Sequence, residues 1–174
     1  KLIGGCPSGT DYHGDFDMVM KEMISLIYVF KNDSNLLTDR AVYNIIHRGL
    51  RPHIGQSFGN NMSILVSILA GGVAIGETEN HVLMIYGSQY LANQYIRQNP
   101  RKIKKLTQGV YADRRQFDNR GTALEDFLLQ AGARVLHAGF FETNARPYQS
   151  ITCHALLNLA QFARDPKIRT TFRN

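Results

Sequence analysis

The sequence has 174 residues, of which 44% are hydrophobic and 20% are charged, a composition that is ordinary for a globular domain. Its net charge at pH 7 is +6, which favours anionic partners over cationic ones. No apolar run reaches the ~18 residues of a membrane span, and Cys6 and Cys153 lack the Cys-x-x-Cys spacing of a zinc site. We therefore expect a single domain over residues 1–174 without a membrane partner, and leave open whether the two cysteines pair.

The N-terminal segment from Lys1 to Gly14 is rich in glycine and predicts a loop, after which Asp15 can cap a helix from Phe16 to about Phe30. The run TDYHGDFD (Thr10 to Asp17) contains three carboxylates and a histidine, which are ligands that divalent cations use. A hard cation needs several oxygens that converge in space, and a linear run does not show convergence. A helix cap with a solvated loop is the simpler interpretation, so we predict no metal and no other cofactor.

The second predicted helix runs from Leu36 to Leu50, where apolar residues recur at helical intervals. The following stretch from Arg51 to Gly76 breaks this pattern, because glycines and the Asn60-Asn61 pair separate two short β-prone runs. The pattern favours a short irregular or β-hairpin insertion. A buried helix from Met62 to Ala70 is the alternative, since a short apolar run has no decisive period.

The run ETENH (Glu77 to His81) places a carboxylate, an amide and an imidazole where a long helix is predicted to begin. Apolar residues at helical spacing then continue to Ile96, and Thr78 is a suitable N-cap. Side chains that bind, donate and accept protons therefore gather at one helix start. The simpler interpretation is a capping cluster with a hydrogen-bonded histidine.

Basic residues are concentrated in RQNPRKIKKL (Arg97 to Leu106) and at Arg114, Arg115 and Arg120. The simplest interpretation is a solvated linker between helices. Beside a groove, such a basic rim would also concentrate an acidic polysaccharide. Nucleic acid is not favoured, because the sequence has no zinc-finger spacing, no recognition-helix motif and no tryptophan.

A second polar cluster, FETNARPYQS (Phe141 to Ser150), separates two predicted helices, Ala123 to Gly139 and Ile151 to Ala163. In the second of these helices, the apolar spacing predicts that His154 and Asn158 lie off the apolar face. We expect helix starts near the following positions: Phe16, Thr38, Glu79, Thr122 and Ile151.

The two polar clusters together resemble (α/α) toroid proteins related to polysaccharide lyases. In that family a Thr-Glu-Asn-His helix is followed by a Gly-Phe-x-Glu-x-Asn-Ser-x-x-Tyr loop and a leucine-rich helix that ends in Ala-x-Asp. Here the first motif is intact at Thr78 to His81, and the second is GFFETNARPY (Gly139 to Tyr148), with Ala145 where the family has serine. The resemblance spans roughly Asp15 to Arg169.

This resemblance implies an all-α fold class in which antiparallel helical hairpins form part of an (α/α) toroid. A complete toroid has more helices than this chain, so we expect the remainder of a longer chain to complete it and isolated hairpins to expose apolar edges. Relatives are commonly exported, which implies a secreted or periplasmic protein. The implied partner is an acidic polysaccharide.

The implied reaction is β-elimination next to a uronic acid, which needs a group that neutralises the carboxylate, a base and an acid. Asn80 suits neutralisation, His81 suits the base, and Tyr148 suits the base or the acid. Substrate binding and orientation are then expected from four further residues: Glu79, Glu142, Asn144 and Arg146. A glycoside hydrolase would instead use two carboxyl groups from Glu79, Glu142 and Asp15. A non-catalytic carbohydrate-binding module, in which both clusters only fix helix ends, is the remaining alternative.

Overall fold

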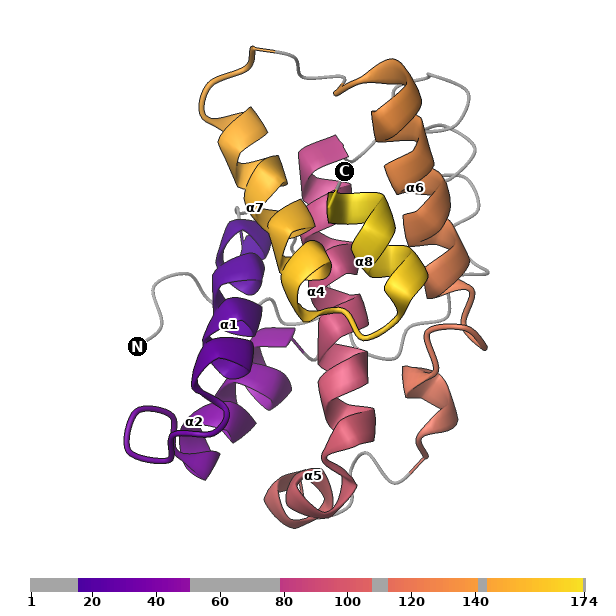
Figure 1. Cartoon of the computed structure of the whole chain (residues 1–174). Helices are drawn as coiled ribbons and strands as arrows, with labels where there is room; N and C mark the ends of the chain where they lie inside the picture. Colours follow the sequence, from indigo (N-terminus) through magenta and orange to yellow (C-terminus); the bar gives the residue numbers. More distant parts are fainter. Residues whose placement is uncertain (1–15, 51–78, 108–112, 141–143, 174) are drawn as a thin grey trace.

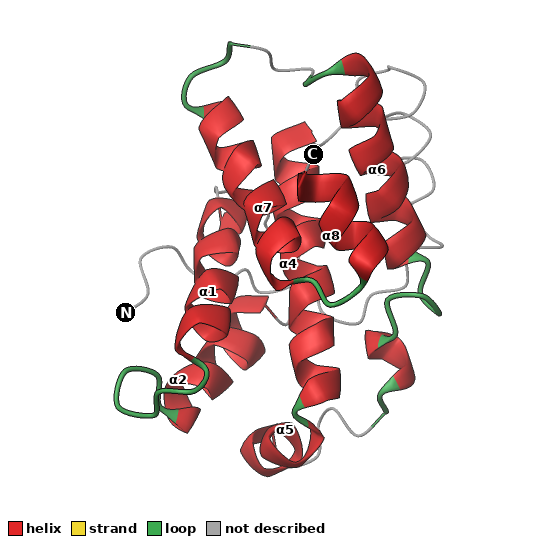
Figure 2. Ribbon diagram, viewed as in Figure 1, coloured by secondary structure: helices red, strands yellow, loops and turns green. Residues whose placement is uncertain are grey.

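The computed structural model describes residues 16–50, 79–107, 113–140 and 144–173, and these residues form helices and connecting turns without a strand (Figures 1 and 2). The expected all-α class is therefore confirmed for this part of the chain. The predicted insertion at residues 51–76 lies outside the described residues. None of the helices in the described ranges is long and apolar enough to cross a membrane.

The helices begin close to the positions that the sequence predicts. They are α1 (Phe16–Phe30), α2 (Asp39–Asn44), the π-helical turn η1 (Ile45–Leu50), α4 (Glu79–Gln98), α5 (Pro100–Thr107), the short 3-10 helix η3 (Arg115–Phe117), α6 (Leu124–Ala138), α7 (Tyr148–Phe162) and α8 (Pro166–Arg173). Thr38 caps α2 by accepting a hydrogen bond from the backbone N–H of Ala41.

Two segments differ from the sequence-based prediction. The predicted helix from Leu36 to Leu50 changes from α-helical to π-helical geometry at Ile45. The basic stretch from Arg97 to Leu106, interpreted as a linker, instead completes α4 and forms α5. Proline at the first position of a helix loses no internal hydrogen bond, so Pro100 starts α5 rather than interrupting a helix.

Helices α1, α4 and α7 run parallel to one another. The Tyr28 hydroxyl of α1 donates to the backbone carbonyl of Leu91 in α4, and Gln94 Nε2, one turn further along α4, donates to the carbonyl of Phe162 in α7. Seven residues earlier in α4, Gly87 faces Ala155 and Leu159 of α7. The residue numbers rise together along these helices, so they are not the two arms of a hairpin.

Helix α6 runs in the opposite direction to α4. The ring of Phe127 packs edge-on against Tyr86 of α4 at 5.2 Å between centroids, whereas the start of α6 lies beside Tyr90. The expected antiparallel arrangement is thus present for α4 and α6, while α1, α4 and α7 depart from it. Between α4 and α7 the reason is that α6 returns the chain to the end of the bundle at which α4 begins (Figure 1).

Helix α4 lies at the centre of the bundle, in contact with α1, α6 and α7 (Figure 1). Nearly every side chain between Val82 and Ile96 is buried, including the polar side chains of Ser88, Gln89, Asn93 and Gln94. The sequence predicted a single apolar stripe on this helix, but a helix with neighbours on several sides buries most of its circumference. Its buried polar groups therefore need hydrogen-bond partners from other elements.

Apolar side chains are exposed on the outer faces of α1 and α7. Val19, Leu26 and Val29 of α1 are between 40% and 56% exposed, and Leu157 of α7 is 62% exposed. We expected such apolar surface for helical hairpins without all their neighbours. Cys153 is a free thiol, and Cys6 lies outside the described residues.

One prediction for α7 is wrong. Asn158 was expected off the packing face, yet it is buried and its Nδ2 donates to the backbone carbonyl of Lys21 at 2.9 Å. Helix α7 packs against α1 as well as α4, so its buried surface is wider than the apolar stripe. The second contact is polar, and hydrophobic spacing does not reveal it.

Candidate functional site

The two polar clusters predicted from the sequence lie at the same end of the bundle. Ala155 and Phe162 of α7 lie opposite Gly87 and Gln94 of α4, and in this register Tyr148 is level with Asn80. That His81 and Tyr148 act on one ligand stays a prediction.

The residues at this end differ in exposure. Asn80 is 1% exposed, His81 is partly buried, and Tyr148 is 41% exposed. Glu79 occupies the first turn of α4, where a negative charge is favourable because the backbone N–H groups there have no helical partner. Partly buried and exposed groups are those that a ligand can reach. The nearly complete burial of Asn80 instead favours a role in holding the helix start.

Two further predicted residues lie in the segment before α7. Asn144 is exposed and adopts a left-handed backbone conformation (φ 64°), which asparagine tolerates better than most residues. Arg146 is exposed and borders a surface hollow of about 480 Å³ that also involves Cys153 and His154. Glu142 and Thr78 lie outside the described residues.

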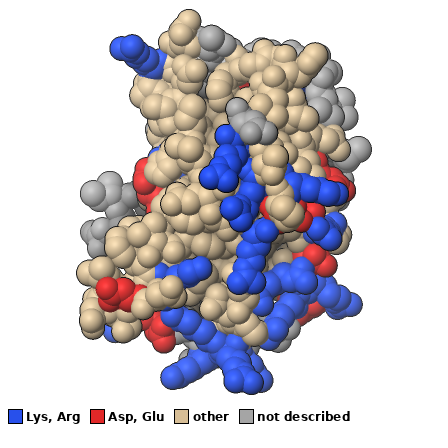
Figure 3. All heavy atoms as spheres, in the orientation of Figure 1, with Lys and Arg blue, Asp and Glu red and all other residues tan. Residues whose placement is uncertain are grey.

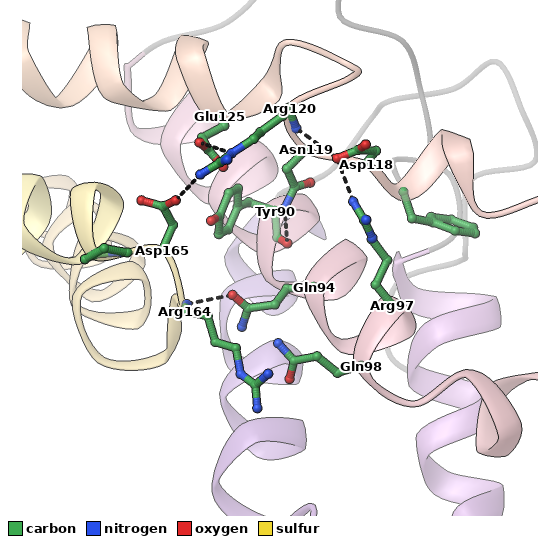
Figure 4. Close-up of a pocket in the computed structure, with 12 residues that line it drawn as sticks. Tyr90, Gln94, Arg97, Gln98, Asp118, Asn119, Arg120, Glu125, Arg164 and Asp165 are labelled. Atoms are coloured by element: carbon green, nitrogen blue, oxygen red, sulfur yellow. Dashed lines mark hydrogen bonds and ion pairs between the residues drawn. The ribbon is translucent and has the colours of Figure 1, made fainter.

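The structure shows a second polar site, which the sequence did not predict. It is an open pocket of about 430 Å³ formed by the C-terminal half of α4, the turn between η3 and α6, and the α7–α8 turn (Figure 4). Its walls include aromatic side chains, amides, three arginines and three carboxylates: Tyr90, Phe117, Gln94, Gln98, Asn119, Arg97, Arg120, Arg164, Asp118, Glu125 and Asp165. Such a volume is within the range of small-molecule sites.

Arg120 connects two walls of this pocket. Its Nε donates to Glu125 Oε1 at 2.9 Å, and its Nη2 donates to Asp165 Oδ2 at 2.7 Å. Both carboxylates are only slightly exposed, at 11% and 12%, whereas the arginine side chain is 70% exposed. The guanidinium therefore holds the start of α6 and the start of α8 together while it faces solvent.

A second ion pair and an amide chain fix the opposite wall. Arg97 Nη1 donates to Asp118 Oδ1 at 2.6 Å. Asn93 Nδ2 donates to Asn119 Oδ1 at 2.9 Å, and Asn119 Nδ2 donates to the backbone carbonyl of Tyr90 at 3.0 Å. These bonds tie the turn before α6 to α4, so this wall is defined by contacts with the buried central helix.

Gln94 fixes the third wall. Its Nε2 donates to the Tyr28 hydroxyl at 2.7 Å and to the carbonyl of Phe162 at 2.9 Å, while its Oε1 accepts from the backbone N–H of Arg164 at 2.7 Å. Every hydrogen-bonding group of this amide except one acceptor lone pair is thus used. The result is that the α7–α8 turn, and with it Arg164, is held against α4.

The protonation of two pocket residues follows from their surroundings. Burial raises the pKa of Tyr90, and the charges of Glu125 and Asp165 raise it further, so its hydroxyl stays neutral. For Asp165, burial acts to raise the pKa, but hydrogen bonds from the Lys167 backbone and from Arg120 outweigh it and the pKa is lowered. The pocket therefore combines the neutral phenol of Tyr90 with the ionised carboxylate of Asp165.

Basic residues gather beside this pocket, at the opposite end of α4 from His81. Figure 3 shows Lys and Arg side chains over α8 and around α5. At ~1.5 Å per residue, the helix rises ~20 Å between His81 and Gln94. Two of the basic residues noted in the sequence, Arg97 and Arg120, therefore line the arginine pocket, far along α4 from His81.

A smaller polar cluster joins α1 to α7. His154 Nδ1 lies 3.2 Å from Glu22 Oε1, and its Nε2 lies 3.4 Å from Ser25 Oγ. The Ser25 hydroxyl is also 2.8 Å from Asn158 Oδ1 and 2.9 Å from the carbonyl of Lys21. The order Glu, His, Ser resembles a catalytic triad, but one hydroxyl proton is shared among three acceptors. We interpret this cluster as a polar contact between helices.

Comparison of the chain with models of known protein families, with curated proteins and with solved structures gave no match. The site therefore has to be interpreted from its own residues. Sequence inspection missed the arginine pocket because its walls come from three distant segments. One local signal was present, since Asp165-Pro166 is a typical helix start, and Asp165 Oδ1 accepts from the backbone N–H of Lys167 at 2.8 Å.

Proposed function

We propose that this protein acts on an acidic polysaccharide, and that β-elimination takes place at the end of the bundle where α4 and α7 begin. The observation that carries the proposal is the shared register of these helices, which puts Asn80 and Tyr148 at the same level. In this proposal the helices are part of an (α/α) toroid, and the protein is secreted or periplasmic.

The chemistry follows from the groups available there. Removing the proton next to a uronate carboxylate requires a base, and His81 is partly exposed at the helix start. The leaving oxygen requires a proton, and the exposed Tyr148 hydroxyl can supply it. Asn144 or Arg146, both exposed, would neutralise the uronate carboxylate, and the buried Asn80 would hold the start of α4 beside His81.

A non-catalytic binding protein is the second candidate, and the burial of Asn80 favours it. A buried amide at a helix start has a structural use that needs no substrate. In that case the basic surface around α5 and α8 would bind the polysaccharide without cleaving it. The two candidates differ in whether new chain ends form.

Incubation of the protein with uronate-containing polysaccharides tests the proposal. A lyase creates unsaturated ends that absorb ultraviolet light, whereas a hydrolase creates reducing ends without that absorbance. We expect ultraviolet-absorbing ends, and their loss by about 100-fold or more in His81→Ala, the usual effect of removing a general base. Tyr148→Phe keeps the ring and tests the hydroxyl alone.

His137→Ala is the control, since it removes an exposed imidazole from the last turn of α6. Melting temperatures of all variants separate lost catalysis from lost folding. Unchanged specific activity in His81→Ala, with a lowered melting temperature, would show that the histidine is structural and would contradict the catalytic assignment.

A further inference from the structure

The arginine pocket has two chemically different halves. In one half, Arg120 is paired with Glu125 and Asp165, and Arg97 is paired with Asp118. In the other half, Arg164 forms no ion pair with any residue in the described part of the chain, although its backbone is held by Gln94. Figure 4 shows the Arg164 guanidinium and the Gln98 amide on the same side of the pocket, away from the Arg120 pairs.

The half around Arg164 is suited to an anion. A guanidinium presents planar N–H donors that match a carboxylate with two parallel hydrogen bonds. The exposed basic residues of α5 and α8 lie beside it and add positive potential (Figure 3). A ligand anion here would pair with an arginine that no carboxylate of the described residues already occupies.

The other half is suited to hydroxyl groups. The carboxylate groups of Asp118, Glu125 and Asp165 have more acceptor lone pairs than their arginine bonds use. The neutral Tyr90 hydroxyl adds a group that donates or accepts, and Phe117 and Pro166 supply apolar wall. Carboxylates repel a second anion, so one negative charge at Arg164 with hydroxyl groups toward Asp118 and Glu125 is the complementary pattern.

We infer that this pocket binds the carboxylate of an acidic sugar at Arg164, as a subsite separate from the end of the bundle that contains His81. The assignment of a carboxylate with neighbouring hydroxyl groups comes from the pocket, whereas the choice of a sugar rests on the proposed function. Because the pocket lies ~20 Å along α4 from His81, it would hold a distant residue of a polymer and take no part in the reaction itself.

NMR titration of the protein with glucuronate tests this inference, with glucose and inorganic sulfate as comparison ligands. We expect glucuronate to shift the side-chain signals of Arg164 and Gln98, and glucose and sulfate to shift them much less. Arg164→Gln should weaken glucuronate binding about tenfold or more, which corresponds to losing a charged hydrogen-bond pair. Arg169→Gln on α8 is the matched control, because it removes an exposed arginine that does not line the pocket.

Unchanged affinity in Arg164→Gln, or equal binding of sulfate and glucuronate, would overturn the inference. Gln98→Ala is a second variant in case Arg164→Gln lowers the melting temperature, and it should also weaken binding. The outcome is independent of catalysis: Arg164-dependent glucuronate binding without polymer cleavage would refute only the proposed reaction. Cleavage that needs His81, with no glucuronate bound at Arg164, would refute only the subsite.

Discussion

Two polar junctions hold the α7–α8 turn in place, and they differ in charge and in exposure. The first is the neutral amide of Gln94, which is buried and bonded to α1, α7 and the turn itself. The second is the ion cluster of Arg120 with Glu125 and Asp165, in which the arginine faces solvent. Buried ions lose hydration that a partner only partly restores, whereas a bonded amide loses far less. The neutral junction is therefore suited to stability, and the charged one remains available to a ligand.

The largest effect is expected at the neutral junction. Gln94→Leu keeps the approximate size of the side chain but leaves the Phe162 carbonyl and the Arg164 N–H without their side-chain partner. It also removes one of the two hydrogen bonds of the Tyr28 hydroxyl, which still donates to Leu91. Because each unsatisfied buried group costs ~1–3 kcal/mol, we expect a loss of about 3 kcal/mol in the free energy of unfolding. Urea denaturation measures it, with Gln161→Leu on the exposed side of α7 as control. A loss below about 1 kcal/mol would show that the Gln94 junction is not the main contributor to stability.

A smaller effect is expected at the charged junction. Asp165→Ala removes the N-cap of α8 and one partner of Arg120, so we expect a loss of about 1–2 kcal/mol at pH 7. Asp165→Asn keeps an oxygen for the cap and should lose less. Equal losses in the two variants would show that a neutral oxygen does not cap α8 and that the charge of Asp165 accounts for the whole effect.

The effect of Asp165 should depend on pH in a defined direction. Its folded-state pKa lies below the ordinary value of 3.8, so the ionised form is favoured by folding. The stabilisation is therefore complete above pH 3.8 and is lost as the pH falls below it, through the folded-state pKa. Thermal unfolding of the protein and of Asp165→Asn at a series of pH values measures the difference. A difference that grew toward acidic pH would have the wrong sign.

A substitution in the cluster of Glu22, Ser25 and His154 between α1 and α7 should lower the free energy of unfolding less than a substitution at either junction. For Glu22, burial acts to raise the pKa, but Lys21 and His154 outweigh it and the pKa is lowered. Its stabilisation is thus present above the ordinary value of 4.5 and is lost as the pH falls. Its side chain is 54% exposed, so Glu22→Gln should cost only about 0.5 kcal/mol at pH 7. A cost above about 2 kcal/mol, measured by urea denaturation, would mean that this cluster is a principal junction of the fold.

The smallest effect is expected for the pair of Asp113 and Arg115, which are joined at 2.9 Å on the surface. Hydrogen bonds from Arg115 lower the Asp113 pKa to about 2, yet both side chains are exposed to solvent. Solvent screens such a pair, so Asp113→Asn should leave the melting temperature unchanged. A clear drop in the melting temperature would show that this ion pair stabilises the fold despite its exposure to solvent.

The helices were largely predictable because their apolar periods are local. Phe16, Thr38 and Glu79 mark helix starts within a residue, since each lies where an apolar period begins beside a capping or acidic residue. Tyr148 starts α7 three residues earlier than expected, and α5 was missed altogether. In α5 the high charge concealed the helical spacing.

The candidate site was predictable only where its residues are adjacent in sequence. ETENH was recognisable because its polar groups are adjacent at one helix start. Its position at the same end of the bundle as Tyr148 depends on the parallel register of α4 and α7. The arginine pocket was not predictable, because Arg97, Arg120 and Arg164 are ordinary surface residues in the sequence. Only packing of three segments around α4 brings them together.

The sequence by itself determined the helical class, most helix starts and the positive charge, because propensity, capping and composition act over a few residues. Tertiary structure decided the direction of the helices, the burial of Asn158 and Gln94, and which pocket arginines pair with a carboxylate. These depend on which segments come to lie beside one another. A polar side chain carries no local mark of whether a partner from a distant helix, water or a ligand will satisfy it.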